Sequence, residues 1–273
     1  MNRIKLFSAI GLLGLFAMTN AEAIQVKVTI KNNAAAGGLA ITPVWVGFHN
    51  GSFDSYNSGV AASSQLQSLA EDGNSSALSA DFSANIGNGV QGSIGSAPIT
   101  AGTSVSAMFN LSGNIDNQYF SYASMVLPSS DYFIANDNPF AHNLGGLFNN
   151  GNSLSFNIGT NGNINDAGTE INDFTSSAGN GLFTGLPSMQ GAPNTGADEN
   201  GVVHKVTSPY ANFVNTPSGF DLTSFDFNSA SFYPNGIATV TISAVPVPAA
   251  AWFMASGLIG LVSFTRKNKT SQV

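Results

Sequence analysis

The feature that most constrains this fold is a set of short stretches in which apolar and polar residues alternate. Residues 25–31 alternate Val26, Val28 and Ile30 with polar side chains. A period of two places alternate side chains on one face, so this stretch predicts a strand with one buried face. Comparable runs, rich in β-branched and aromatic residues, predict further strands at 41–48, 105–111, 119–127, 153–158 and 237–244.

Asn-Gly pairs separate many of these runs. They begin at residues 50, 88, 150, 161, 180, 200 and 235. Each pair can supply the positive φ angles of a tight hairpin turn, so the pattern predicts an antiparallel sandwich or barrel. Residues 61–70, with Leu66 and Leu69 at helical spacing, predict one short helix that stops at Glu71-Asp72-Gly73 and covers a sheet edge. We expect residues 175–201, rich in Gly, Ser and Asn, to form a long loop.

The charges are distributed unevenly. The chain of 273 residues has 8 Lys and Arg, 15 Asp and Glu, and no Cys. Between residues 24 and 245 the cations are Lys27, Lys31 and Lys205, against 14 acids, which gives this interior a formal charge of −11. A nucleic-acid partner is excluded, because phosphate binding requires clustered Lys and Arg. The lack of Cys excludes disulfides and a thiol nucleophile.

Residues 1–23 have the organisation of a secretory signal peptide. Arg3 and Lys5 precede an apolar run over 6–18, and Ala21-Glu22-Ala23 supplies small residues at a cleavage site. We therefore expect export through the inner membrane and a mature chain that begins at Ile24, with one domain over 24–244.

Residues 245–273 combine a Val-Pro-Val-Pro-Ala-Ala motif, an apolar helix over about 248–265 and a basic tail with Arg266, Lys267 and Lys269. This order resembles the PEP-CTERM sorting signal in a variant with V-P-x-P-A-A. The resemblance implies an exosortase-type processing enzyme, membrane attachment before that processing, and a surface or extracellular destination in a Gram-negative envelope. A plain membrane anchor is the alternative.

Several separated blocks resemble the spondin domain of bacterial proteins. They are residues 41–54 (ITPVWVGFHNGSFD), 69–74 (LAEDGN), 122–135 (YASMVLPSSDYFIA), 166–170 (DAGTE) and 192–200 (APNTGADEN). The resemblance implies an antiparallel β-sandwich, extracellular placement, adhesion to a surface or matrix ligand such as an exopolysaccharide or a protein, and a bound calcium ion. The ligands that it implies are Asp131, Asp166 and Glu170.

The chemistry of these residues leaves two interpretations open. Calcium takes oxygen ligands, and Gly168 permits a sharp turn between Asp166 and Glu170, so acids from two loops can approach one another. Alternatively, Asp131 and Asp166 only form turns by bonding their own backbone. Trp45, Phe48, Phe53 and Tyr56 are either a carbohydrate-stacking patch or, as we expect, part of the core.

Nothing in the sequence indicates an enzyme. His49, His142 and His204 lack metal-binding spacing, and we expect His49 and His204 at the surface. No nucleophile elbow or phosphate-binding loop is present. The sequence therefore predicts a non-catalytic, calcium-binding adhesion module. Its alternatives are a structural surface protein without a specific ion and a secreted carboxylate-based hydrolase.

Overall fold

The computed structural model describes residues 24–160, 163–175, 181–186, 196–207, 210–220 and 235–246. The predicted signal peptide and the predicted helix over 248–265 lie outside these residues, as does part of the loop expected at 175–201. Within the described ranges, no helix is long and apolar enough to cross a membrane.

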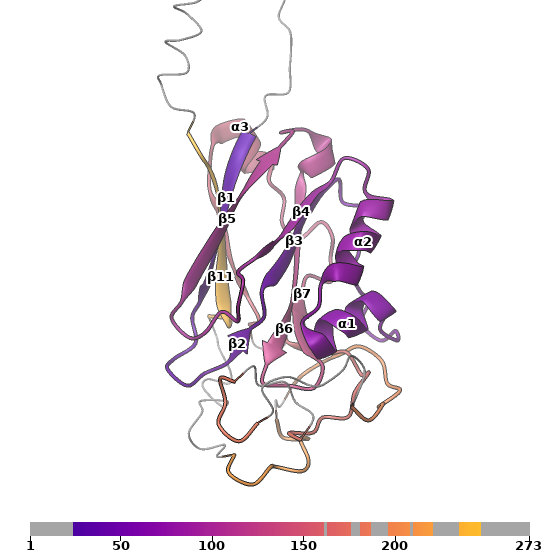
Figure 1. The fold of residues 1–273 in the computed structure, drawn as a ribbon. Helices are drawn as coiled ribbons and strands as arrows, with labels where there is room; N and C mark the ends of the chain where they lie inside the picture. Colours follow the sequence, from indigo (N-terminus) through magenta and orange to yellow (C-terminus); the bar gives the residue numbers. More distant parts are fainter. Residues whose placement is uncertain are drawn as a thin grey trace, which may run out of the picture.

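Two antiparallel sheets form the body of the domain (Figure 1). The first sheet has the order β5 (Ser104–Leu111), β1 (Ile24–Asn32), β11 (Ala238–Ala244) and β8 (Leu154–Ile158). The second runs β10 (His204–Lys205), β9 (Asn165–Asp166), β7 (Tyr132–Ala135), β6 (Tyr119–Leu127), β3 (Val44–His49) and β4 (Val90–Ile94), and β2 (Ala40–Ile41) also pairs with β6. The predicted all-β antiparallel fold is confirmed.

The two ends of the described domain meet in the first sheet. Strands β1 and β11 pair with Val26 opposite Ala244, so the first and last strands close the domain side by side. Their outer ends lie at the top of Figure 1, whereas the loops that follow β9 and β10 gather at the bottom, beneath α1. The loops therefore lie at the opposite end of the sandwich from the points where the chain enters and leaves it.

The prediction of one short helix was wrong, because the described residues contain three: α1 (Ser64–Asp72), α2 (Ser76–Asn85) and α3 (Gly145–Asn150), together with a 3-10 helix over Ile115–Asn117. Helix α2 buries Leu78 and Phe82, too few positions to produce a helical pattern in the sequence. Helix α1 continues through Glu71 and Asp72, two residues beyond the predicted range, and ends at Gly73 (φ 65°), the residue of the predicted stop that supplies the left-handed cap.

Both faces of the second sheet are buried in its central strands, β3, β6 and β7. The whole of β3 is buried, since one face packs against the first sheet and the other against α1 and α2 (Figure 1). On the helix side, the Trp45 ring centroid lies 5.4 Å from those of Phe53 and Phe82. Tyr56 and Phe48 are also buried, so the core interpretation of these aromatic residues is confirmed.

Two of the described Asn-Gly pairs form turns other than the hairpins that we predicted. Asn150-Gly151 ends α3, with Gly151 at φ 68°. Asn50-Gly51 leads out of β3 into the segment that carries α1 and α2, because residues 50–89 are inserted between the paired strands β3 and β4. Positive φ angles were predicted correctly here, but they cap a helix and bend the chain instead of closing hairpins.

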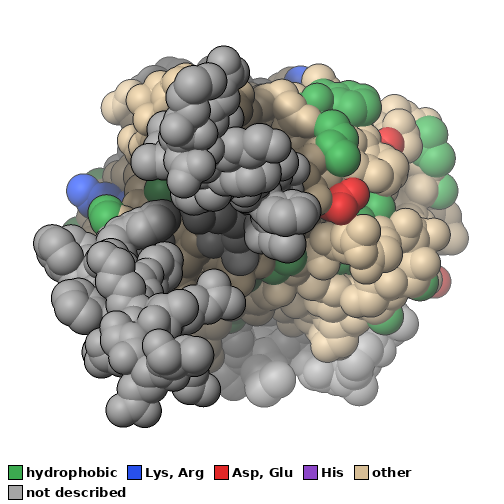
Figure 2. Space-filling view, turned by 90° about the horizontal axis from the view of Figure 1, so that it is seen from above, with side chains coloured by type: hydrophobic (Ala, Val, Ile, Leu, Met, Phe, Trp, Pro, Cys, Tyr) green, Lys and Arg blue, Asp and Glu red, His purple; other side chains and the backbone are tan. Residues whose placement is uncertain are grey.

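The surface at the end of the sandwich that carries α3 is poor in charge. Figure 2 looks onto this end, where the described surface that grey atoms leave uncovered is mostly backbone and uncharged polar side chains, with several hydrophobic groups and scattered acidic and basic groups.

His49 is buried, so the expectation of a surface position was wrong. Its Nδ1 accepts the Gly51 backbone N–H at 2.9 Å, and its Nε2 lies 2.8 Å from Ser121 Oγ. The ring is therefore neutral and carries its proton on Nε2. Burial lowers the pKa of His49 to about 4.

We expect the His49 contribution to stability to be complete above about pH 6.5 and to be lost as the pH falls toward 4. The unfolded chain takes up a proton in that window and the native ring does not. The difference in melting temperature between the natural protein and His49→Asn should be constant at pH 7–8 and shrink between pH 6.5 and 4. A constant difference over the whole range would contradict the buried neutral ring.

Candidate functional site

The β6–β7 hairpin fixes the position of Asp131. The hydroxyl of Ser129 donates to the Val126 carbonyl at 2.6 Å and accepts the Tyr132 N–H at 3.0 Å. These bonds hold the turn closed, and Asp131 lies at its end, directly before β7, with its side chain fully buried. The sequence folds this way because a serine hydroxyl can satisfy both a donor and an acceptor in a buried turn.

One carboxylate oxygen of Asp131 joins the hairpin to the loop after β9. Oδ2 accepts the backbone N–H groups of Thr169 at 2.8 Å and Glu170 at 3.1 Å, and the Thr169 hydroxyl at 3.1 Å. The other oxygen, Oδ1, is buried and has no hydrogen-bond partner among the described residues. When only one oxygen of a buried carboxylate accepts hydrogen bonds, the cost of removing the other oxygen from water is not compensated.

Asp166 is the last residue of β9, directly before the same loop, and is also buried. Its Oδ1 accepts the Gly168 N–H at 2.7 Å, and its Oδ2 accepts the Asn172 side-chain amide at 2.8 Å. The first of these bonds is the turn-forming role that we left open for this residue. Asn172 Oδ1 is a second buried oxygen that lacks a hydrogen-bond partner among the described residues.

Glu170 is 2% exposed and lies against the segment that begins at Gly196. A β-carbon added at Gly196 would overlap the Glu170 carboxylate. The two segments are paired through the backbone, since the Ile171 N–H donates to Ala197 O at 2.8 Å and the Glu199 N–H to Thr169 O at 3.0 Å. Glu170 therefore lies in the same group of loops as Asp131 and Asp166.

Glu71 belongs to this group, although we did not predict it from the sequence. It lies in the last turn of α1 and is 2% exposed; its carboxylate accepts the Gln67 side-chain amide at 2.9 Å. Burial raises its pKa, and a hydrogen bond with the Thr169 side chain opposes that shift. Thr169 thus joins α1 to Asp131. The available signal was the block at residues 69–74, which the resemblance covered without assigning a ligand.

The acidic side chains of the site lie close together, and no Lys or Arg among the described residues forms an ion pair with them. Burial and then the neighbouring Asp166 carboxylate raise the pKa of Asp131 to about 8. In the described parts of the chain, the ion pair at the site is His204 Nε2 with Asp166 Oδ2 at 3.8 Å, with His204 largely exposed. Glu199 is largely exposed, but the partial burial of its carboxylate and then the negative charge of Asp166 raise its pKa.

The structure places Asp131 and Asp166 close enough to interact electrostatically, and it places Glu170 four residues after Asp166, in the loop whose backbone Asp131 holds. No three His, Asp or Glu side chains in the described residues converge closely enough to hold a metal ion as they stand. The calcium ligands therefore stay a prediction.

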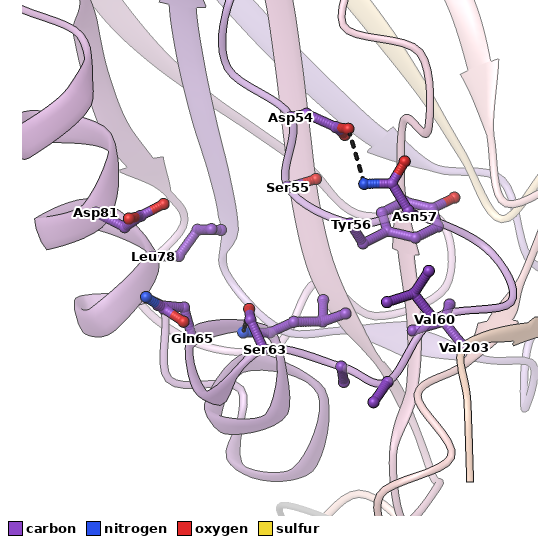
Figure 3. A pocket seen from close by; sticks show the side chains of 13 residues that line it. Asp54, Ser55, Tyr56, Asn57, Val60, Ser63, Gln65, Leu78, Asp81 and Val203 are labelled. Carbon is purple, nitrogen blue, oxygen red and sulfur yellow. Dashed lines mark hydrogen bonds between the residues drawn. The ribbon is translucent and has the colours of Figure 1, made fainter.

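Two hollows lie on the helix side of the second sheet and at its edge. The larger, about 350 Å³, is bounded by the segment 54–63 and by helices α1 and α2 (Figure 3). Its polar groups are partly satisfied internally, since the Asn57 side-chain amide donates to Asp54 at 3.1 Å. The smaller, about 230 Å³, lies beyond Tyr56, which lines both.

Comparison with known proteins finds a family model that matches part of the chain. Residues 40–140 match the sequence model of the Spondin_N family. No curated protein matches the chain. The match contains three of the blocks on which the resemblance rested, those at 41–54, 69–74 and 122–135, and supports a spondin-domain protein. The blocks at 166–170 and 192–200 lie beyond it.

Gly168 gives a test of how tightly the loop is packed. Its φ is +66°, and a β-carbon would lie 2.7 Å from the backbone N and O of Val202. We expect Gly168→Ala to lower the free energy of unfolding by more than Gly102→Ala. Gly102 has a similar φ of +74° but open space around it, so its substitution costs about 1–2 kcal/mol of backbone strain alone. Equal losses in denaturant unfolding would show that the loop does not depend on this close contact.

Proposed function

We propose that this chain is an exported, non-catalytic adhesion or matrix-interaction module whose loop end is stabilised by calcium. The Spondin_N match at residues 40–140 supports an extracellular module of this type. The sequence patterns at both ends support export and sorting to the envelope by an exosortase-type enzyme, with the membrane helix attached before processing.

The calcium proposal rests on the buried carboxylate of Asp131 and its unpaired oxygen. Its Oδ1 is buried without a hydrogen-bond partner among the described residues, and its neighbour Asp166 is a second buried acid. Two carboxylates in a low-dielectric site repel one another unless a proton or a cation is present. A divalent cation would remove both the repulsion and the desolvation cost of Oδ1.

The donor chemistry of the site fits calcium. Calcium prefers about six to eight carboxylate, amide and carbonyl oxygens, without a strict geometry. Asp131, Asp166 and Glu170 would hold the ion, and Glu71 and Asn172 are the nearby candidates for further oxygens. The absence of Cys and the outward position of His204 disfavour zinc, which takes thiolate and imidazole ligands.

A bound ion would act as a structural cross-link. Asp131 belongs to the β6–β7 hairpin, Asp166 is the last residue of β9 and Glu170 lies in the loop after it, and Glu71 belongs to α1. Contacts to one ion would hold these three elements together and order the loops at the end of the sandwich away from the chain ends (Figure 1). An adhesion module needs such a fixed end, because ordering loops on binding costs affinity.

The structural alternative without an ion has one observation in its favour, the bond from the Gly168 N–H to Asp166, which is a turn-forming role. A carboxylate-based hydrolase has weaker support. Asp131, Asp166 and Glu170 are each at most 2% exposed, which leaves no room for a substrate at these acids.

We expect calcium to raise the melting temperature of the protein and a chelator to reverse the change. At a free calcium concentration about 100 times the Kd, binding adds about 2.7 kcal/mol. For a domain of this size that corresponds to about 5–10 °C in a thermal melt. Asp131→Asn keeps the shape of the side chain but removes its charge, so this variant should lose most of the calcium response.

Asp116→Asn is the matched control, because Asp116 lies in the 3-10 helix between β5 and β6 and belongs to none of the elements of the site. It should respond to calcium as the natural protein does. No shift with calcium in the natural protein, or the same shift in Asp131→Asn, would exclude the proposed site and favour the ion-free alternative.

A further inference from the structure

The outer face of the first sheet differs in charge from the rest of the domain. Its strands β5, β1, β11 and β8 contain Lys27 and Lys31 but no Asp or Glu. The Asp and Glu residues that the structure describes all lie in the second sheet, the helices and the loops. The third described lysine, Lys205, also lies in the second sheet. The first sheet is therefore the basic side of an otherwise acidic domain.

The alternation of β1 places both lysines on the outer side of the sheet. Val26, Val28 and Ile30 are buried in the core, whereas Lys27 and Lys31 are exposed. The cross-strand register surrounds the lysines with outward side chains of β5 and β11. Apart from Met108, these neighbours and the residue between the two lysines all carry hydroxyls: Thr29, Ser104, Ser106, Thr239, Thr241 and Ser243.

This face is extended and open. Helices α1 and α2 pack against the second sheet, and the first sheet forms the opposite side of the domain (Figure 1). A strand rises about 3.3 Å per residue, so Lys27 and Lys31 lie about 13 Å apart along β1. An open surface with two separated cations fits a long partner with spaced negative charges better than a small molecule.

The polar side chains of the face can bond neutral groups of such a partner. Within the face, the Gln25 amide donates to the Asn110 side chain at 3.2 Å, and the hydroxyls of Ser155 and Thr241 lie 3.1 Å apart. A hydroxyl has one hydrogen to donate and two lone pairs to accept, so one such bond leaves it able to bond a ligand as well. The face thus combines two cations with a surface rich in hydroxyls.

We propose that this face binds an acidic polysaccharide. The carboxylates of the polymer pair with Lys27 and Lys31, and its hydroxyls bond the Ser and Thr side chains between them. An anionic membrane fits less well, because such surfaces recruit clusters of about four to eight Lys or Arg. An acidic peptide also fits less well, because it has few hydroxyls to match those of the face.

The acidity of the rest of the domain determines how this binding depends on salt. The second sheet packs about 10 Å behind the first, so its acids lie farther from a ligand on this face than Lys27 and Lys31 do. The Debye length is about 30 Å at 0.01 M salt, about 10 Å at 0.1 M and about 3 Å at 1 M. We therefore expect the strongest binding at about 0.1 M salt, where the distant acids are screened and the contacting lysines are not.

The inference rests on the proposed adhesion function and deepens it, because it names the class of ligand that the module holds. The face belongs to the other sheet from the one that carries Asp166 and the hairpin of Asp131. The calcium proposal is tested by melting temperature, and this one by polymer binding in the presence of a chelator. Either can therefore fail without the other, and the chelator prevents calcium from bridging the polymer to acids of the protein.

The test is surface plasmon resonance of the full chain over immobilised polygalacturonate, a polymer of an acidic sugar, with dextran as the neutral polymer. We expect saturable binding to polygalacturonate at about 0.1 M salt, loss of binding at about 1 M salt, and no binding to dextran. Lys27→Gln and Lys31→Gln should each weaken binding about two- to fivefold, as expected for one exposed ion pair. Lys27→Arg keeps the charge and should bind as the natural protein does.

Lys205→Gln is the matched control, because it removes the same charge from an exposed lysine of the second sheet. It should leave polymer binding unchanged. The proposal is overturned if polygalacturonate does not bind, or if Lys205→Gln weakens binding as much as Lys27→Gln. It is also overturned if polyglutamate or phosphatidylglycerol vesicles bind as tightly with the same dependence on Lys27 and Lys31. Self-association that Lys27→Gln abolishes would assign the face to a second copy of the chain instead.

Discussion

The contact between the Asp131 carboxylate and the backbone of residues 169–170 is the interaction on which the loop end depends. The loop after β9 has few apolar side chains of its own, so a buried charge holds it to the sheet by accepting three hydrogen bonds. Bonds to a charged acceptor are stronger than neutral ones, but only when the charge itself is compensated. The second oxygen of Asp131, Oδ1, has no hydrogen-bond partner among the described residues to compensate its negative charge. A cation bound at Oδ1 would supply that compensation.

The rest of the domain explains why that position is buried. Strand β3 is covered on both faces, and the inserted residues 50–89 return to the sheet with α1 and α2 on its outer side. Helix α1 thereby brings Glu71 to Thr169, against the loop that Asp131 holds. The aromatic cluster around Trp45 stabilises the helices on the sheet and thus also fixes one wall of the acidic site.

The strands with clear alternation could be predicted from the sequence, because each has one face in a core and one outside. Strand β1 is the best example: its burial alternates along nearly its whole length. Strand β7 was included in a motif but not foreseen as a separate strand, since its four residues are all buried and show no alternation. Helix α2 was missed for a similar reason, because burial of Leu78 and Phe82 depends on the sheet beneath them.

Local sequence patterns also could not predict the surroundings of single residues. Asp131 and Asp166 could be named from their motifs, but their burial and their proximity follow from the pairing of β7 with β9, which no local pattern encodes. His49 was wrongly expected at the surface because a strand end beside Asn-Gly is usually exposed. Here residues 50–89 fold back over it.

A crystal structure of the protein grown with calcium tests the central claim most directly. The account predicts one ion beside Asp131, with Oδ1 about 2.3–2.6 Å from it and an oxygen of Asp166 among the other ligands. An Asp131 oxygen bonded to water or to a protein donor, with no ion at the site in saturating calcium, would contradict it.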